Sequence, residues 1–328
     1  MALDPALRAQ LTLPAICAPM FTVTGPDLVR EACKAGVIGG LPHQNARGIE
    51  EFEIWLAAIR RDLDAYKAEN PQARIGPVAV NLATQQPDLR AYLDLMGRYG
   101  VDIVISASGD PTDLVAQVHD WGGKVFHDVT NLRFAEKAIR AEADGLTCIG
   151  AGGGGHSGTI SHLALIPQIR AMFDGVIIMA GAVSTGAAIR AAEVLGADLA
   201  YLGTRFIATQ ESAAPAGYKE LLVSQRSADL IYTGGIAGVP ANWMRASISQ
   251  NGLDPDDLPQ PLAKGKTYEH LPEGVRPWKT VWSAGQGIDL IGDIPPVAEL
   301  VRRLRAEYVA ACAIPDMAEA ARLVDAVL

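Results

Sequence analysis

The stretch VIIMAGAVSTGAAIRAAEVLGADLAYLGT, residues 176–204, contains one complete repeat of the fold that the sequence predicts. The apolar runs at 176–181 and 199–204 are short and mostly unbroken, which is typical of strands buried on both faces. Between them, Ser184 precedes a helix-like segment that ends at Gly196, a residue suited to a helix C-cap. The stretch therefore predicts a strand, a helix and a second, parallel strand.

Six further apolar runs of the same kind precede this stretch and alternate with helix-like segments. They occupy residues 15–20, 37–42, 76–82, 102–108, 124–129 and 145–152. Eight strand–helix units are the pattern of an α/β fold of the (β/α)8 TIM-barrel type. A doubly wound open sheet is the alternative, but the count of eight and the absence of GxGxxG after the first run favour the barrel.

The alternation of apolar runs and helix-like segments ends after the eighth run. Residues 211–275 are helix-like but irregular and contain the clusters GGIAGVP, LDPDDLPQPL and LPEGVRP. We therefore predict a smaller, mainly helical cap at 211–275, inserted into a barrel formed by 1–210 and 276–328. Apolar residues at 297, 300, 301 and 304 predict an amphipathic helix that returns to the barrel.

Charge and composition exclude several classes of partner. The 328 residues carry a net charge of −9 with a pI near 5.2, which argues against nucleic acid. No apolar run has the length of a membrane span and the N-terminus lacks a secretory pattern, so a cytoplasmic enzyme is expected. Cys17 and Cys148 lie in apolar runs and are interpreted as core residues, and no Cys/His spacing predicts a metal site.

Glycines mark three strand exits, where TIM barrels place their active sites. They follow the sixth, seventh and eighth runs, at 152–155, 181 and 203. Loops after the last two strands bind phosphate in many barrels through backbone N–H groups. His156 follows the first of these glycine clusters, and an imidazole with an ordinary pKa near ~6.5 accepts a proton at neutral pH. We expect a phosphate-bearing ligand that His156 faces.

Six motifs in this order resemble the nitronate monooxygenase family of FMN-dependent TIM barrels, which also includes enoyl-thioester and quinone reductases. They are APM (18–20), VNL (80–82), GGHSG (154–158), MAGAVSTG (179–186), LGTRF (202–206) and WSAGQGIDLI (282–291). The resemblance implies FMN as cofactor, O2 and a small molecule such as an alkyl nitronate or nitroalkane as partners, and His156 as the catalytic base or hydrogen-bonding group. The resemblance and the strand ends together predict these cofactor-binding residues: Pro19, Met20, Asn81, His127, Gly154, Gly155, Gly181, Gly203, Thr204, Arg205, Ser283 and Gln286.

Two departures from the family pattern leave alternatives open. Gly152 stands where many members have an acidic residue. His127 and Asp128 stand where some members have a lysine or a small polar residue. They either contact the flavin and the substrate pocket, or lie in the barrel wall and cap the following turn.

The function also has alternatives. One is an NAD(P)H-dependent flavin reductase of an enoyl- or acyl-thioester or of a quinone. Another is a flavin-free phosphate-binding barrel such as an aldolase, which is disfavoured because Lys124 lies at the wrong end of its strand. An exposed barrel end with an irregular cap often pairs, so a homodimer is one expectation.

Overall fold

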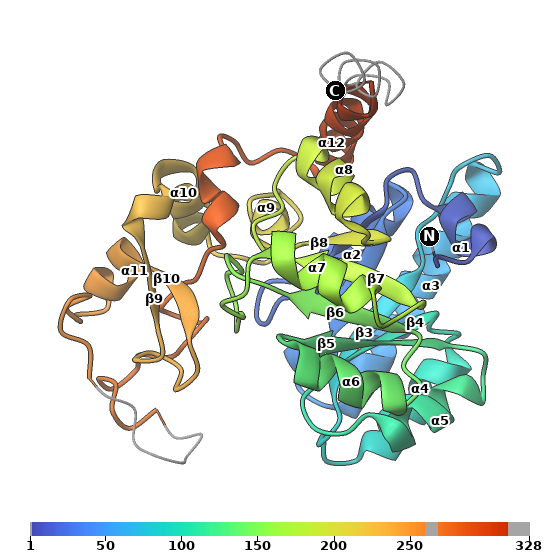
Figure 1. Cartoon of the computed structure of the whole chain (residues 1–328), viewed down its shortest axis with the longest axis horizontal. Coiled ribbons are helices and arrows are strands. Elements are labelled where there is room, and N and C mark those ends of the chain that lie inside the picture. Colours follow the sequence, from blue (N-terminus) through green and yellow to red (C-terminus); the bar gives the residue numbers. More distant parts are fainter. Residues whose placement is uncertain (1, 260–267, 314–328) are drawn as a thin grey trace, which may run out of the picture.

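The computed structural model describes residues 2–259 and 268–313 and centres on a closed barrel of eight parallel strands (Figure 1). Each strand pairs with the next, and β8 pairs with β1. Each of the eight barrel strands overlaps a predicted run, so the (β/α)8 barrel is confirmed and the open sheet was the wrong alternative. The strands are β1 (Ala15–Cys17), β2 (Ile38–Pro42), β3 (Val78–Ala83), β4 (Ile103–Ala107), β5 (Lys124–Val129), β6 (Gly145–Ile149), β7 (Val176–Ala180) and β8 (Leu199–Leu202).

Apolar side chains pack on both faces of the barrel wall, inside the barrel and between the strands and the surrounding helices. Because successive side chains of a strand point to opposite faces, Ile103 and Ile105 of β4 join the inner cluster, whereas Val104 joins an outer one. Leu3 and Leu11, which flank the short helix α1 (Pro5–Gln10), belong to the same inner cluster. The N-terminal segment therefore packs against the barrel interior and precedes the first strand.

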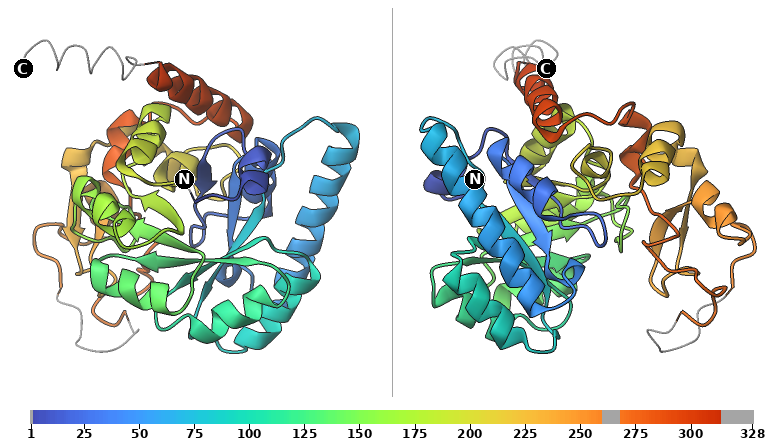
Figure 2. Two further views of the ribbon diagram at one scale, coloured as in Figure 1. Left: turned by 45° about the vertical axis from the view of Figure 1, so that its right-hand side comes forward. Right: turned by 180° about the vertical axis from the view of Figure 1, so that it is seen from behind.

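Helices surround the barrel, and the last one completes the ring (Figure 2). Helix α12 (Val297–Cys312) packs against α8 and α2, and the four predicted apolar positions 297, 300, 301 and 304 are all buried. None of the described helices is long and apolar enough to cross a membrane. The others of the barrel are α2 (Pro26–Lys34), α3 (Ile49–Glu69), α4 (Leu89–Arg98), α5 (Thr112–His119), α6 (Leu132–Arg140), α7 (His162–Arg170), α8 (Gly186–Leu195), α9 (Thr204–Ile207) and the short 3-10 turn η1 (His43–Asn45).

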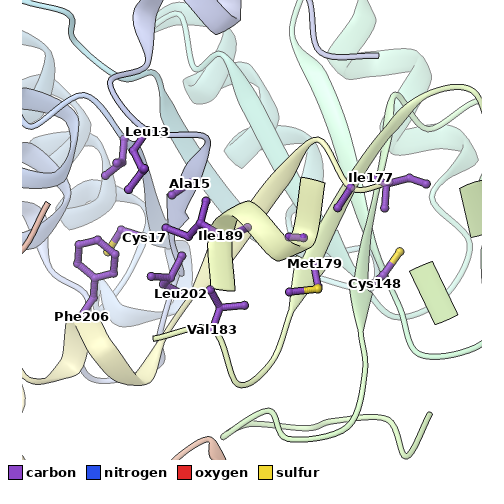
Figure 3. Close-up of a cluster of buried hydrophobic side chains, with 14 of the residues drawn as sticks. Leu13, Ala15, Cys17, Cys148, Ile177, Met179, Val183, Ile189, Leu202 and Phe206 are labelled. Atoms are coloured by element: carbon purple, nitrogen blue, oxygen red, sulfur yellow. The ribbon is translucent and has the colours of Figure 1, made fainter. Parts of the chain in front are cut away.

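The repeat at 176–204 shows how sequence and packing agree. Thr185, one residue after Ser184, caps α8 by accepting the Ala188 N–H at 3.1 Å. Gly196 ends the helix with a φ of +107°, a conformation that favours glycine. Ile189 of α8 packs in one buried cluster with residues of β1, β6, β7 and β8, including Cys17 and Cys148, as expected (Figure 3).

The chain between α9 and α12 forms the cap, at one end of the barrel (Figure 1). The cap has a core of its own, which includes Ile236, Trp243, Ile248 and Val281. Val281 lies past residue 275, so a residue outside the predicted cap contributes to this core. The division of the chain at 211 and 275 stays a prediction. The sequence did not predict its two-stranded antiparallel sheet. The elements are α10 (Ala216–Ser224), η2 (Ser227–Asp229), β9 (Leu230–Thr233), β10 (Ala241–Met244), α11 (Arg245–Gln250) and η3 (Gln286–Leu290).

Candidate active site

A cavity of about 1960 Å³ lies at the carboxyl ends of the barrel strands, between the barrel and the cap. All but two of the predicted site residues line it, including His156. Arg205 and Gln286 do not. The predicted residues that line it are Pro19, Met20, Asn81, His127, Gly154, Gly155, His156, Gly181, Gly203, Thr204 and Ser283.

Three of the four glycines before His156 differ in backbone conformation and in the space that a side chain would have. Gly152 has a φ of +90°, which side chains rarely adopt. A Cβ on Gly154 would lie 2.8 Å from the Gly285 nitrogen and 2.9 Å from the Ala284 carbonyl carbon, so backbone packs on backbone there. A Cβ on Gly155 would meet nothing within 4 Å. Gly155, which lines the cavity, therefore leaves the space that a ligand can use.

Long-range hydrogen bonds hold this glycine-rich loop (residues 152–156) in place. The Gly152 carbonyl accepts the Gln286 N–H at 2.9 Å, and the Gly153 carbonyl accepts the side-chain amide of Asn242 at 2.7 Å. The Gly285 N–H in turn donates to the Thr204 hydroxyl at 2.9 Å. Gln286 thus contributes to the site as a brace of the loop through its backbone.

His156 projects from the braced loop to the cavity wall. Its ring meets the edge of Trp278 at a centroid distance of 5.0 Å and an interplanar angle of 86°. Surrounding protein atoms lower the pKa of His156 from its ordinary value, because desolvation disfavours the imidazolium. The imidazole is therefore neutral at pH 7 and has a free nitrogen lone pair for a proton.

The two polar residues at the end of β5 face different surroundings. The His127 Nδ1 lies 2.8 Å from the Ser106 hydroxyl, and burial lowers the pKa of His127 to about 4. Asp128 is next to it on the strand, yet its Oδ1 is buried without a hydrogen-bond partner in the described chain. Both residues line the cavity, as one of the two sequence interpretations expects.

The loops after β7 and β8 present backbone N–H groups. Gly181 and Ala182 have φ values of +121° and +57°, and successive N–H groups in such turns form concave anion sites. Within the described chain no acceptor pairs with the N–H groups of Gly181, Ala182, Thr204 or Arg205. These groups lie where many TIM barrels bind phosphate.

Two predicted contacts use atoms that the fold already engages. The Arg205 guanidinium is buried and pairs with Asp293 at 2.7 Å, so its charge is already engaged within the fold and its contact with the cofactor stays a prediction. The Met20 N–H donates to the Thr24 hydroxyl, and the Met20 carbonyl accepts the Asn45 amide, both at 3.0 Å. The Met20 N–H and carbonyl are therefore already engaged, and the backbone contact expected at the first strand stays a prediction.

Sequence reasoning gave no site role to Asn242, and it left two interpretations of Trp278, as a wall beside the flavin or substrate or as a buried core residue. Asn242 is buried beside the glycine-rich loop, and Trp278 lies against His156. The signal for Asn242 was weak, since it lies within the PANW segment (240–243) of an irregular region. Trp278 has a φ of +61°, which is uncommon for a non-glycine residue and marks a position that the surroundings fix.

These features fit a flavin mononucleotide. The unpaired N–H groups after β7 and β8 suit a phosphate, the space beside Gly155 suits a flat ring, and the cavity is larger than either needs. Asn81 adds a side-chain amide at the cavity wall. Within the described residues no cluster of His, Cys, Asp and Glu has the arrangement of a metal site.

Comparisons with known proteins show the family to which the chain belongs. The family model described as nitronate monooxygenase matches residues 6–307. The nitronate monooxygenase of Paraburkholderia phytofirmans is 27% identical over 90% of this chain and 92% of that protein. A (3aS,4S,5R,7aS)-5-hydroxy-7a-methyl-1-oxo-octahydro-1H-indene-4-carboxyl-CoA dehydrogenase of Rhodococcus jostii is 26% identical over 72% of this chain and 63% of that protein.

The fold has solved counterparts as well. The structure of a nitroalkane oxidase from Streptomyces ansochromogenes superimposes with a TM-score of 0.74 at 24% identity, covering 94% of this chain and 99% of that chain. This likeness shows a shared fold. Because the family model spans nearly the whole chain, the protein belongs to the nitronate monooxygenase family and is a flavin-dependent oxidoreductase.

Proposed function

We propose that the protein binds FMN and oxidises alkyl nitronates or nitroalkanes with O2, with His156 as the base or hydrogen-bonding group. The observation that carries this proposal is the position of His156, a neutral imidazole on the wall of the cavity, behind Gly155 and against Trp278. FMN, when bound, supplies electron acceptance and the chemistry with O2. The chain supplies orientation, a cavity between the barrel and the cap, and a site for a proton.

The choice of FMN rests on the phosphate-sized cradle. The N–H groups of Gly181, Ala182, Thr204 and Arg205 are unpaired within the described chain and come from the two loops that bind phosphate in many TIM barrels. One monophosphate satisfies such a cluster, and no dinucleotide fingerprint follows the first strand.

The two substrate forms require different chemistry from His156. A nitroalkane carries a proton on the carbon beside its nitro group, and the neutral imidazole accepts that proton as the carbon gives up electrons. A nitronate has already lost the proton, so a protonated or neutral His156 only donates a hydrogen bond to its oxygens. Removing the imidazole therefore slows a nitroalkane more than its nitronate.

A second candidate is an NAD(P)H-dependent flavin reductase of an enoyl- or acyl-thioester or of a quinone. The cavity extends to Lys137 and Arg140 of α6, which form no ion pair in the described chain. Cations at the rim suit the phosphates of an extended ligand such as a CoA thioester or a nicotinamide cofactor. The Rhodococcus relative is named for a CoA-linked substrate.

Anaerobic reduction separates the candidates. The purified protein is mixed with nitroethane or its nitronate in one sample and with NADH or NADPH in another, and the flavin absorbance is followed. Bleaching by the nitro compound alone supports oxidation of nitro compounds. Bleaching by the nicotinamide alone assigns the protein to the reductases. A colourless protein that does not take up added FMN overturns both.

A further inference from the structure

The cavity contains a carboxyl group that the proposed reaction does not use. Asp128 of β5 is opposite Thr147 of β6 in the strand register, and Asp128 lines the cavity. Asp128 Oδ1 and Thr147 Oγ1 are both buried, and neither has a hydrogen-bond partner in the described chain. Thr147 does not line the cavity, so Asp128 is the residue of this pair that brings an unpartnered polar atom to the cavity wall, where buried polar groups are otherwise almost always hydrogen-bonded.

Among residues 2–259 and 268–313, Asp128 forms no ion pair with a Lys, Arg or His side chain. Desolvation raises the pKa of Asp128 to about 7, although the nearby Thr147 hydroxyl opposes this shift. The ionisable groups whose pKa values respond to Asp128 are Tyr201 of β8 and Cys148 of β6, and burial raises the pKa of each, so both are neutral at pH 7. On its own strand, Lys124 is paired with Asp144 at the far end, and His127 contacts Ser106.

We propose that Asp128 is a neutral carboxylic acid that donates a hydrogen bond to a carbonyl oxygen of the bound isoalloxazine ring, so that ionisation of Asp128 weakens flavin binding. This inference rests on the proposed flavin site. The ring also offers an N–H group, which an ionised Asp128 would accept. That arrangement would leave a buried negative charge without a cation, which is far more costly than a neutral hydrogen bond.

The proposal fixes the sign of a pH effect. If bound flavin needs the proton on Asp128, the pKa of Asp128 is higher in the complex than in the free protein. Flavin affinity is then constant below the free-protein value of about 7. Above it, the affinity falls by about tenfold per pH unit until the pKa of the complex is reached. Asp128→Asn retains an N–H donor but does not titrate, so its affinity lacks this step.

The test measures the dissociation constant of FMN by fluorescence quenching between pH 6 and 9. All proteins carry His156→Asn, because His156 faces the same cavity. The set comprises this background alone, Asp128→Asn, Asp128→Ala and the matched control Asp110→Asn. Asp110 is the other carboxylate that lines the cavity in the described chain, and hydrogen bonds from Thr112 lower its pKa.

We expect the affinity of the background protein to fall by at least tenfold relative to Asp128→Asn as the pH rises from 6 to 9. Asp128→Ala binds about 3- to 10-fold more weakly than the background at pH 6, because a hydrogen bond is lost. Asp110→Asn keeps the background profile. Since ionisation of the FMN phosphate affects every variant alike, the ratio between variants reports Asp128 alone.

Two outcomes overturn the inference while leaving the proposed flavin site intact. One is the same pH profile in the background protein and in Asp128→Asn. The other is an affinity of the background protein that rises with pH relative to Asp128→Asn. If no variant binds FMN at any pH, the proposed function fails and this inference fails with it. The infrared band of a protonated carboxylic acid is a direct check at pH 6, present in the FMN complex and lost in Asp128→Asn. Its absence from the complex also overturns the inference.

Discussion

The glycine-rich loop after β6 presents a side chain to the cavity, whereas the two loops after β7 and β8 present backbone N–H groups. In the first, the carbonyls of Gly152 and Gly153 are engaged by the cap side of the molecule, and the side chain of His156 faces the cavity. In the other two, the Thr204 hydroxyl and the Arg205 guanidinium are engaged, and backbone N–H groups remain. With the proposed function, this difference predicts that turnover and cofactor affinity depend on separate chemical groups and can be separated by mutation.

The largest expected effect comes from the side chain of the glycine-rich loop. His156→Asn is predicted to lower kcat for a nitroalkane by about 10²- to 10⁴-fold, because the base is lost, while FMN stays bound. Steady-state oxygen consumption gives kcat, and absorbance of the purified variant gives the FMN content. Loss of flavin from the variant would show that His156 holds the cofactor, and the division between the loops would fail.

The backbone of the same loop is tested by a pair of alanine substitutions. Gly154→Ala is predicted to lower the free energy of unfolding by about 1–3 kcal/mol, because its Cβ would collide with the backbone of Ala284 and Gly285. Gly155→Ala is the control, since its Cβ meets nothing within 4 Å, and it is expected to change stability by less than about 0.5 kcal/mol. Urea denaturation followed by circular dichroism compares them. Equal losses would contradict the packing described for Gly154.

The loop after β8 is tested through its arginine. Arg205→Met is predicted to change the dissociation constant of FMN by less than about threefold, because the guanidinium is paired with Asp293. Because Arg205 is buried but Asp293 stays paired with Arg303, the free energy of unfolding is expected to fall by about 1–3 kcal/mol. Fluorescence titration with FMN is the measurement. A loss of affinity above about tenfold would mean that the Arg205 side chain contacts the phosphate.

The smallest expected effect is the pH dependence around neutrality. Desolvation lowers the pKa of His156, so the base is neutral at pH 7 and protonates only below the ordinary range of histidine. For a nitroalkane, kcat/KM is predicted to change by less than about twofold between pH 7 and 8 and to fall only in the acid range, below the ordinary histidine pKa of about 6.5. The profile is recorded in Asp128→Asn, which removes the other nearby titration. A fall that begins above pH 7 would require a raised pKa.

Much of the barrel was predictable because its strands are buried on both faces. Such strands are short apolar runs, and all eight runs were recognisable for that reason. The last helix was predictable from the spacing of its four apolar residues, of which Val297 and Leu304 are the outermost. The glycine clusters and His156 could also be placed, since strand ends converge at one end of a TIM barrel.

Other features depend on partners far along the chain. The strands β9 and β10 have four residues each, and β9 is only partly buried, so their pattern does not differ from that of the neighbouring turns. Nothing near Arg205 in the sequence indicates Asp293, 88 residues away. Along β5, neighbouring side chains point to opposite faces, and only the register of the barrel shows that Asp128 is opposite Thr147.

The hydrogen bonds that brace the glycine-rich loop also bear on how the protein is made. Asn242 contacts Gly153 across 89 residues, and Gly285 contacts Thr204 across 81. A ribosome synthesises all eight strands before it reaches Asn242, so the barrel has its complete set of strands while the loop still lacks its brace. Assembly of the flavin site is therefore a late event, which follows translation of the segment that contains Gly285 and Gln286.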